Sequence, residues 1–174
     1  MFPYGYKIGR FSLFSMIPDF FIIKPSAHGL GAFASRDIAP GKVIFRIPPG
    51  RFELITYQQL LKKRVTDNPL QISPRRYLDW SGPALRFNHS CEPNAGLTSY
   101  PHLHYVALTA IKKGEEIRWD YSTSVDKDTE CDFDCDCDAK TCRTKIGGFF
   151  DLSKRLKARY LKANIVQEFL KKEK

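Results

Sequence analysis

Short runs of apolar residues separated by turn residues recur along most of the chain. The clearest run is residues 43–47, which lies between Pro40-Gly41 and Pro48-Pro49-Gly50. Comparable runs occupy residues 20–23 (ending at Pro25), 31–33, 103–108 and 116–119. Apolar runs of this length, bounded by glycine and proline, are typical of β-strands rather than of helices. The pattern therefore predicts a mostly β domain of many short strands.

Helical periodicity is visible in two places. Residues 56–64 are expected to form a short helix with Leu60 and Leu61 on its buried side. Near the C-terminus, apolar residues recur at helical spacing: Leu156, Tyr160, Leu161 and Ile165, with Phe169 beyond. Ser153 can cap this helix, whose other faces carry Lys154, Arg155, Lys157, Arg159 and Lys162. The first interpretation is a solvated basic helix packed on the domain, and the second is a nucleic-acid or nucleosome contact.

Length and composition indicate one globular domain. The chain has 174 residues, 43% of them hydrophobic, and no apolar run approaches the roughly 20 residues that span a bilayer. The longest apolar stretch, residues 11–23, is interrupted by Pro18 and Asp19. Lys7 and Arg10 precede it as in a secretory signal, but a small-residue cleavage site is missing. We therefore expect no membrane contact and an intracellular protein, cytoplasmic or nuclear.

The formal net charge of +9 is unevenly distributed. Residues 126–138 contain seven acidic residues and only Lys127, so this window carries −6 and the remainder of the chain +15. An acidic surface within a basic protein can attract a basic peptide. A solvated acidic loop without a partner is an equally weighted interpretation.

Three separated motifs carry candidate chemistry. They are His28-Gly29-Leu30-Gly31-Ala32-Phe33, then Arg86-Phe87-Asn88-His89-Ser90-Cys91-Glu92-Pro93-Asn94, then Gly114-Glu115-Glu116-Ile117-Arg118-Trp119-Asp120-Tyr121. Taken singly, a Gly-x-Gly marks a turn or a close approach of the backbone to a ligand. A lone histidine or strand-end tyrosine is more often a buried side chain with its polar atom hydrogen-bonded. The second motif is more informative as a run of nine residues than any of its residues is alone.

In this order, the three motifs resemble those of the SET domain family of protein-lysine methyltransferases. The resemblance covers roughly residues 20–150 and implies the β-clip SET fold, with short strands in small sheets and a C-terminal helix. It also implies a pseudoknot-like threading that brings Asn88 beside Tyr121. Together with the segments outside the resemblance, the expected divisions are an N-terminal segment 1–19, a SET domain 20–125, a cysteine-rich post-SET zinc segment 126–150 and a C-terminal amphipathic basic helix 151–174.

The resemblance also implies the site residues. Tyr121 takes the place of the catalytic tyrosine, and Tyr105 and Trp119 are expected to line the substrate channel. Trp119 stands where family members commonly have phenylalanine or tyrosine, at a position that influences how many methyl groups are added. The residues expected to bind S-adenosylmethionine are His28, Gly29, Leu30, Gly31, Arg86, Phe87, Asn88, His89, Tyr121 and Phe133.

Four of the five cysteines lie between residues 131 and 142. An odd number of cysteines in a chain without a clear export signal indicates a metal site rather than disulfides. Cys135, Cys137 and Cys142 supply three thiols, and the fourth ligand is either the local Cys131 or the distant Cys91. In the SET family, three post-SET cysteines join the cysteine of the Asn-His-Ser-Cys motif around one structural zinc. The resemblance therefore implies Cys91, Cys135, Cys137 and Cys142, with Cys131 spare.

The expected activity is methyl transfer from S-adenosylmethionine to a lysine of a protein, with a histone or other basic tail as the expected partner. Such a displacement needs a neutral amine, whereas free lysine with a pKa of about 10.4 is mostly charged at neutral pH. An apolar channel and a nearby sulfonium would both favour the neutral form. The alternative hypothesis is a zinc-stabilised chromatin- or nucleic-acid-binding module with a vestigial methyltransferase site.

Overall fold

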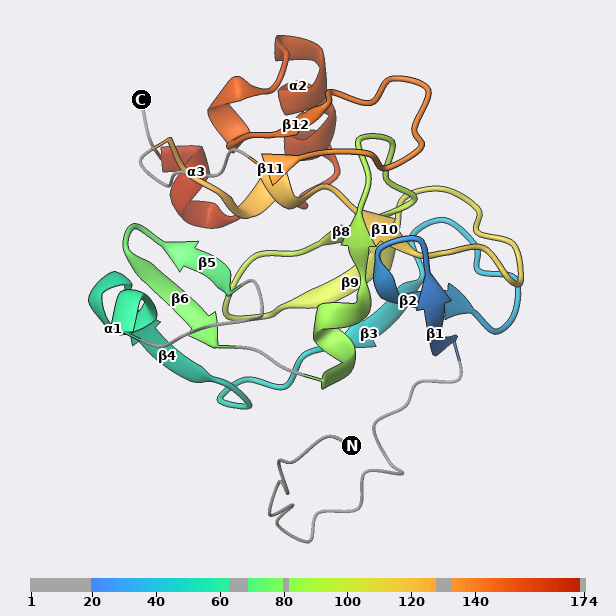
Figure 1. Cartoon of the computed structure of the whole chain (residues 1–174), viewed down its shortest axis with the longest axis horizontal. Coiled ribbons are helices and arrows are strands. Elements are labelled where there is room, and N and C mark those ends of the chain that lie inside the picture. The colour runs from blue at the N-terminus through green and yellow to red at the C-terminus, as the bar shows by residue number, and fades with distance from the viewer. Residues whose placement is uncertain (1–19, 63–68, 80–81, 128–132, 173–174) are drawn as a thin grey trace, which may run out of the picture.

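The computed structural model describes residues 20–62, 69–79, 82–127 and 133–172. Short strands in sheets of two or three dominate it, as the apolar pattern predicts (Figure 1). The fold class expected from the SET resemblance is confirmed by small, mostly antiparallel sheets with few helices.

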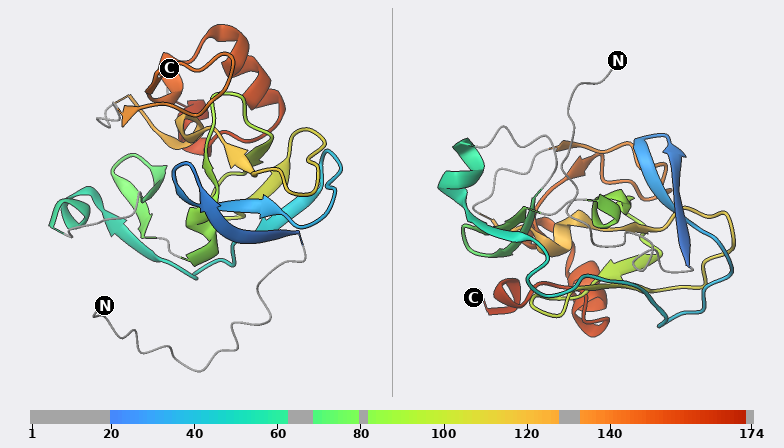
Figure 2. Two further views of the ribbon diagram at one scale, coloured as in Figure 1. Left: turned by 45° about the vertical axis from the view of Figure 1, so that its right-hand side comes forward. Right: turned by 90° about the horizontal axis from the view of Figure 1, so that it is seen from below.

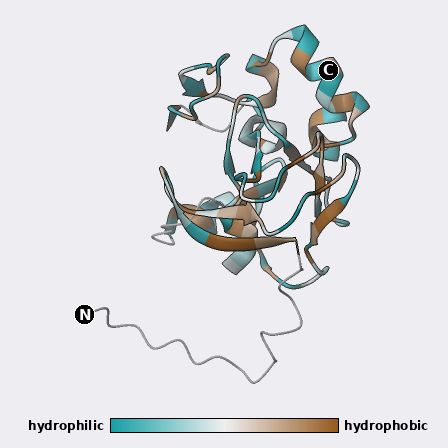
Figure 3. Ribbon diagram, turned by 90° about the vertical axis from the view of Figure 1, so that its right-hand side faces the viewer, coloured by the Kyte–Doolittle hydropathy of each residue, from teal (hydrophilic) through white to brown (hydrophobic). Residues whose placement is uncertain are grey.

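The first two strands form a separate antiparallel ribbon. β1 (Phe21–Ser26) and β2 (Gly29–Ala34) are joined by a two-residue turn, after which Gly29 adopts a φ of +93° that favours glycine. The sequence pattern ended the first strand at Pro25, and this was wrong by one residue. Pro25 lacks a backbone N–H, but a two-stranded ribbon consists only of edge strands, which tolerate proline. Figure 3 colours most of this ribbon as hydrophobic.

The central sheet has the strand order β3-β9-β8 and is antiparallel. β3 is Val43–Arg46, β9 is His104–Ala107 and β8 is Ala95–Leu97. The Tyr105 ring of β9 is fully buried and stacks on Phe87, with ring centroids 3.9 Å apart. The central sheet therefore packs against the second motif through the contact of Tyr105 with Phe87.

A second three-stranded sheet lies within residues 51–85, where the apolar pattern predicted no strand. Its order is β4 (Glu53–Thr56), β6 (Arg76–Asp79) and β5 (Leu70–Ser73). The strands are four residues long and mix polar with apolar residues. Four residues are too few for alternation to be distinguished from a loop, which explains the omission.

The predicted short helix exists as α1 (Tyr57–Lys62), although its last two predicted residues lie outside the described ranges. Thr56 and Gln59 cap it reciprocally: the Gln59 N–H donates to Thr56 Oγ1, and the Thr56 N–H donates to Gln59 Oε1. The expected burial of its two leucines was wrong. Leu61 is 61% exposed and Leu60 only half-buried, because α1 rests on the edge of a small sheet.

The second and third motifs lie side by side. β7 (Asn88–His89) pairs in parallel with β10 (Arg118–Trp119), so Asn88 is opposite Arg118 and His89 is opposite Trp119. The 3-10 helix η2 (Gly82–Arg86) precedes β7, and η3 (Tyr121–Ser124) follows β10. Segments thirty residues apart therefore pair directly, as the SET resemblance implies.

The cysteine-rich segment and the C-terminal helices form a layer beside this centre (Figures 1 and 2). β11 (Phe133–Asp134) pairs with β12 (Lys145–Ile146), and the 3-10 helix η4 (Phe149–Asp151) leads to the helices α2 (Lys154–Lys162) and α3 (Glu168–Lys172). None of the helices in the described ranges is long and apolar enough to cross a membrane.

The C-terminal helix was predicted as one element, and it is two. Ser153 caps α2 as expected, because its Oγ accepts the Leu156 N–H at 3.3 Å. The chain leaves the helix at Asn164, whose φ is +55°, a conformation that asparagine tolerates. Gln167 then turns into the protein, where its amide binds residues 98–100. Leu161, predicted on the apolar face, is 42% exposed.

Candidate active site and metal centre

Asn88 joins the three motifs. Its Nδ2 lies 2.7 Å from Glu116 Oε1 in the third motif and 3.3 Å from the Leu30 carbonyl in the first. A third oxygen, Ser26 Oγ, is 3.1 Å away. One side chain of the second motif thus holds the β1–β2 turn against the strand that leads to Tyr121.

Gly31 leaves room for this junction. A Cβ at position 31 would lie 2.2 Å from Glu116 Oε1 and 3.1 Å from Asn88 Nδ2. The sequence interpretation attributed the glycine to close approach of a ligand. In the structure, the glycine also gives room to two side chains of the other motifs, and the approach of a ligand stays a prediction.

Tyr121 lies beside both β7 and β10. Its backbone N–H donates to His89 Nδ1 at 3.3 Å, and its hydroxyl lies 3.4 Å from the Phe87 carbonyl. The rings of His89 and Tyr121 meet edge to face, with centroids 5.3 Å apart. Burial, and to a smaller extent the negative charge of Glu116, raises the pKa of Tyr121 to about 12. The hydroxyl is therefore protonated at physiological pH and is available as a hydrogen-bond donor.

The two residues predicted to line the channel form an aromatic wall next to Tyr121. The centroid of Trp119 lies 5.0 Å from that of Tyr121 and 6.0 Å from that of Tyr105. Both side chains are buried, with Trp119 Nε1 donating to the Phe87 carbonyl and the Tyr105 hydroxyl to the Ala84 carbonyl. The wall is apolar because its polar atoms are already bound, which suits an amine that must be neutral. Its role as a channel stays a prediction.

The other predicted cofactor residues differ in their exposure and contacts. His28 lies on the β1–β2 turn, and its Nδ1 is 3.5 Å from Asp136 of the cysteine-rich segment. Leu30 is 44% exposed. Arg86 ends η2 and is half-buried. Phe133, on β11, is 56% exposed, and its assignment is the least supported by contacts.

Four cysteines lie close together: Cys91 of the second motif and three cysteines of the cysteine-rich segment. Cys91 Sγ lies 3.8 Å from Cys135 Sγ, which lies 3.7 Å from Cys142 Sγ. Cys137 Sγ accepts the Cys91 N–H at 3.3 Å. Four thiolates around a tetrahedral zinc, with Zn–S distances of about 2.3 Å, have sulfurs about 3.8 Å apart. The Cys91–Cys135 and Cys135–Cys142 spacings both match this value. The fifth cysteine, Cys131, lies outside the described residues.

Backbone N–H groups point at these sulfurs, as they do around metal-bound thiolates. The Arg143 N–H donates to Cys91 Sγ, and the Thr144 N–H donates to Cys142 Sγ, both at 3.4 Å. Burial raises the pKa of the Cys91 thiol to about 11. At Cys137 burial also opposes ionisation, but N–H groups of Cys91 and Ala139 outweigh it and lower the pKa to about 7. A divalent cation would deprotonate all four thiols and remove the cost of burying them.

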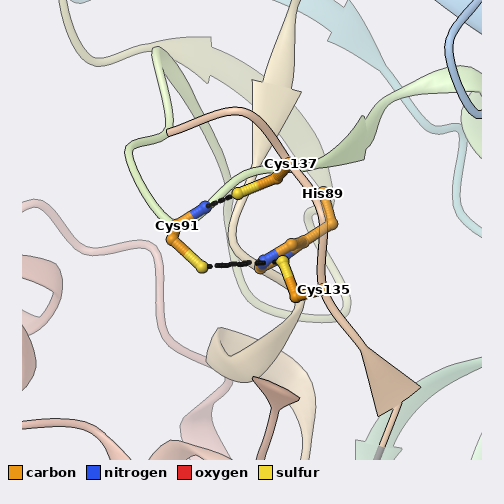
Figure 4. Close-up of side chains that lie close together, drawn as sticks. All are labelled: His89, Cys91, Cys135 and Cys137. Atoms are coloured by element: carbon orange, nitrogen blue, oxygen red, sulfur yellow. Dashed lines mark hydrogen bonds between the residues drawn. The ribbon is translucent and has the colours of Figure 1, made fainter. Parts of the chain in front are cut away.

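His89 is a competing ligand. The ligand atoms of His89, Cys91, Cys135 and Cys137 all lie within 4.8 Å of one another (Figure 4). Burial lowers the pKa of His89 to about 4, so its imidazole is neutral and carries one proton. Because Nδ1 accepts the Tyr121 N–H, that proton belongs on Nε2, which lies 3.4 Å from Cys91 Sγ. A protonated Nε2 donates to the sulfur and cannot bind a metal, which favours Cys142 as the fourth ligand.

Sequence reasoning missed Asp120 and Arg143. The Asp120 carboxylate is completely buried and accepts two hydrogen bonds from the Arg143 guanidinium, both 2.8 Å long. The only sequence signal was that Asp120 precedes the predicted catalytic tyrosine and Arg143 follows the last cysteine.

The profile of the SET domain matches residues 29–122, which is more than half of the chain. No curated protein matches the chain by sequence. Among solved structures, the crystal structure of KRYPTONITE in complex with mCHG DNA and SAH has a TM-score of 0.54 and 21% identity, covering 71% of this chain and 28% of that one.

A second similar structure is the humanized mutant of the Chaetomium thermophilum Polycomb Repressive Complex 2 bound to the inhibitor GSK126. Its TM-score is 0.52 at 18% identity, and the alignment covers 62% of this chain and 15% of that one. This chain therefore spans less than a third of either protein, and at these identities the likeness concerns the fold. Together with the three assembled motifs, the profile match shows that the chain belongs to the SET domain family.

Proposed function

We propose that this protein is an S-adenosylmethionine-dependent protein-lysine N-methyltransferase. The observation that carries the proposal is the meeting of all three motifs around Asn88, with Tyr121 held at the end of β10 against His89. Separate structural roles for the motifs would not require them to converge on one junction.

The residues divide into a cofactor side and an amine side. We propose that residues 28–31 and 86–89, together with Tyr121 and Phe133, hold S-adenosylmethionine. When bound, this cofactor supplies an electrophilic methyl group on a sulfonium. Tyr121 is the proposed catalytic residue, because its protonated hydroxyl can orient the reacting groups, and positioning supplies much of the rate in such a displacement. Trp119 and Tyr105 exclude water from the path of the lysine.

We propose that Cys135, Cys137 and Cys142 of a post-SET segment (residues 126–150) bind one structural zinc ion together with Cys91 of the second motif. The sulfur spacings near 3.8 Å and the N–H donors at the sulfurs support this set. The ion would tie the loop after β7 to the segment that follows β10.

The proposed substrate is a basic peptide with an accessible lysine, such as a histone tail. In the acidic window, the side chains of Asp134 and Asp136 are 93% and 87% exposed; Asp134 pairs with Lys145 at 3.0 Å, and Asp136 lies 3.5 Å from His28. Asp126 is instead buried against Gln71 and belongs to the core. The exposed carboxylates beside the site would attract a positively charged segment.

The proposal is tested by incubating the zinc-loaded protein with S-adenosylmethionine and either core histones or a whole-cell lysate. Mass spectrometry should detect methylated lysines, and it would identify the substrate and the number of methyl groups together. Absence of transfer to any protein, from a folded and zinc-loaded sample, would argue against the proposal.

The rate should rise with pH from about 6 to 10, because the fraction of neutral lysine rises and Tyr121 does not ionise in this range. The sign follows from the pKa of about 12 for Tyr121: its hydroxyl keeps the proton while the substrate amine, with a lower pKa, loses one. The measurement is kcat against pH with a saturating peptide. A fall in kcat between about pH 8 and 10, in protein still folded by circular dichroism, would contradict the assignment.

A second function, nucleic-acid binding, is favoured by one observation on α2. Four basic side chains of this helix are exposed, have no acidic partner within the described ranges and lie within about 140° of the helix circumference. They are Lys154, Arg155, Arg159 and Lys162.

Replacing these four residues by glutamine should weaken binding to duplex DNA and flatten its salt dependence. Each lost phosphate contact should reduce the slope of log K against log salt by about 0.9. Fluorescence anisotropy at several salt concentrations measures both effects. A control variant with four other exposed basic residues replaced should bind as the wild type does, and equal weakening would indicate only non-specific attraction. The control set is Arg46, Arg51, Lys113 and Lys140.

A further inference from the structure

The carboxylate of Asp120, directly before Tyr121, is held by groups from three separate segments. Its side chain has no exposed surface. Arg143 Nη1 donates to Oδ2 and Nη2 to Oδ1, each at 2.8 Å, in a bidentate pair. The Tyr160 hydroxyl donates to Oδ2 at 3.0 Å, and the Ser122 N–H donates to Oδ1 at 3.1 Å. Such a carboxylate has a single well-defined position, because every oxygen is bound twice.

Arg143 belongs to both the cysteine cluster and this carboxylate. It follows Cys142, and its backbone N–H donates to Cys91 Sγ at 3.4 Å. Its side chain reaches the residue that begins the turn carrying Tyr121. The backbone of Arg143 therefore contacts the cysteine cluster, while its side chain contacts Asp120.

His89 makes a second connection in the same direction. Its Nε2 contacts Cys91 Sγ at 3.4 Å, and its Nδ1 accepts the Tyr121 N–H at 3.3 Å. Tyr121 is thus connected to the cysteine cluster through its own backbone and through the preceding side chain. These two connections extend beyond the cysteine-rich segment to the residues at the start of η3.

We propose that Arg143 is a positioning residue that makes the orientation of Tyr121 depend on metal binding at the cysteine cluster. This inference rests on the proposed function for its effect on rate, but the structural coupling stands independently of it. Helix α2 takes part as well, because the Tyr160 hydroxyl donates a hydrogen bond to Asp120 Oδ2. Metal loss would then displace Tyr121 before the β-sheets unfold.

The decisive variant is Arg143→Lys, which keeps the positive charge but loses the bidentate geometry. In the zinc-loaded protein, kcat should fall about 10- to 100-fold, as expected when a reacting group is misplaced by about 1 Å. The KM for the peptide should change much less. The control Lys140→Ala removes an exposed charge from the same loop and should leave both constants unchanged. If Arg143 were merely structural, kcat per folded, zinc-loaded molecule would not change, and that result would overturn the proposal.

Hydrogen exchange of the amides of residues 120–124 provides a readout that needs no activity. In the wild type, these amides should exchange at least about tenfold faster after zinc is removed with a chelator, because η3 loses its anchor. Zinc-loaded Arg143→Lys should already exchange fast, and Tyr160→Phe should lie between the two. Equal protection of these amides with and without zinc would refute the coupling. If the wild type transfers no methyl group but shows this exchange pattern, the proposed function fails and the coupling holds.

Discussion

Replacing Tyr121 by phenylalanine should lower methyl transfer by about 100-fold or more while leaving the fold and the zinc content unchanged. The substitution removes one oxygen atom. That oxygen lies 3.4 Å from the Phe87 carbonyl, which is too long for a strong hydrogen bond, so little stability depends on it. The ring, which contacts His89 and Trp119, is retained. A large loss of rate with a small loss of stability is therefore expected.

The measurement is the single-turnover rate of lysine methylation, read by mass spectrometry, with the melting temperature recorded beside it. Tyr100→Phe is the matched control, because Tyr100 is 40% exposed and lies in the loop bound by Gln167. Undiminished transfer by Tyr121→Phe would mean that another group orients the amine. Equal loss in both variants would mean that the assay reports stability rather than catalysis.

The strands that the sequence predicts well are those that bury one face against the central core. The runs at residues 43–47 and 103–108 correspond to β3 and β9, whose inward side chains are large and apolar. The sheet within residues 51–85 was missed because its four-residue strands mix polar and apolar positions on a partly exposed surface. Leu54 and Leu61 remain exposed there, so apolar residues alone did not mark the buried side.

The candidate site depends on contacts that local patterns cannot reveal. The adjacency of the second and third motifs came from the family resemblance, and the parallel pairing of β7 with β10 confirms it. The buried pair of Asp120 and Arg143 joins residues 23 positions apart, and no local pattern in the sequence links them. Only the fold shows that Arg143 turns inward. The break between α2 and α3 had a weak signal, because Asn164 is a residue that readily ends helices.

Replacing Cys91 by serine should abolish stoichiometric zinc binding, which we expect to be one ion per chain in the wild type. A serine hydroxyl does not ionise at neutral pH and so cannot replace a thiolate ligand. Cys91 is also the only cluster member outside the cysteine-rich segment among the described residues, so its loss disconnects that segment from β7. The melting temperature should therefore fall together with the zinc content, since structural zinc contributes directly to folding.

Metal analysis after dialysis, compared across three serine variants, distinguishes the candidate ligand sets. Cys91→Ser and Cys142→Ser should both lose zinc if the four-cysteine set is correct, and Cys131→Ser should retain it. Retention by Cys142→Ser alone would instead identify His89 as the fourth ligand, with its proton moved to Nδ1 against the Tyr121 N–H. Retention by Cys91→Ser with loss in Cys131→Ser would indicate a local site confined to residues 131–142. In that case zinc would no longer bridge the two halves of the active site, and the link from the metal to Tyr121 through His89 would not exist.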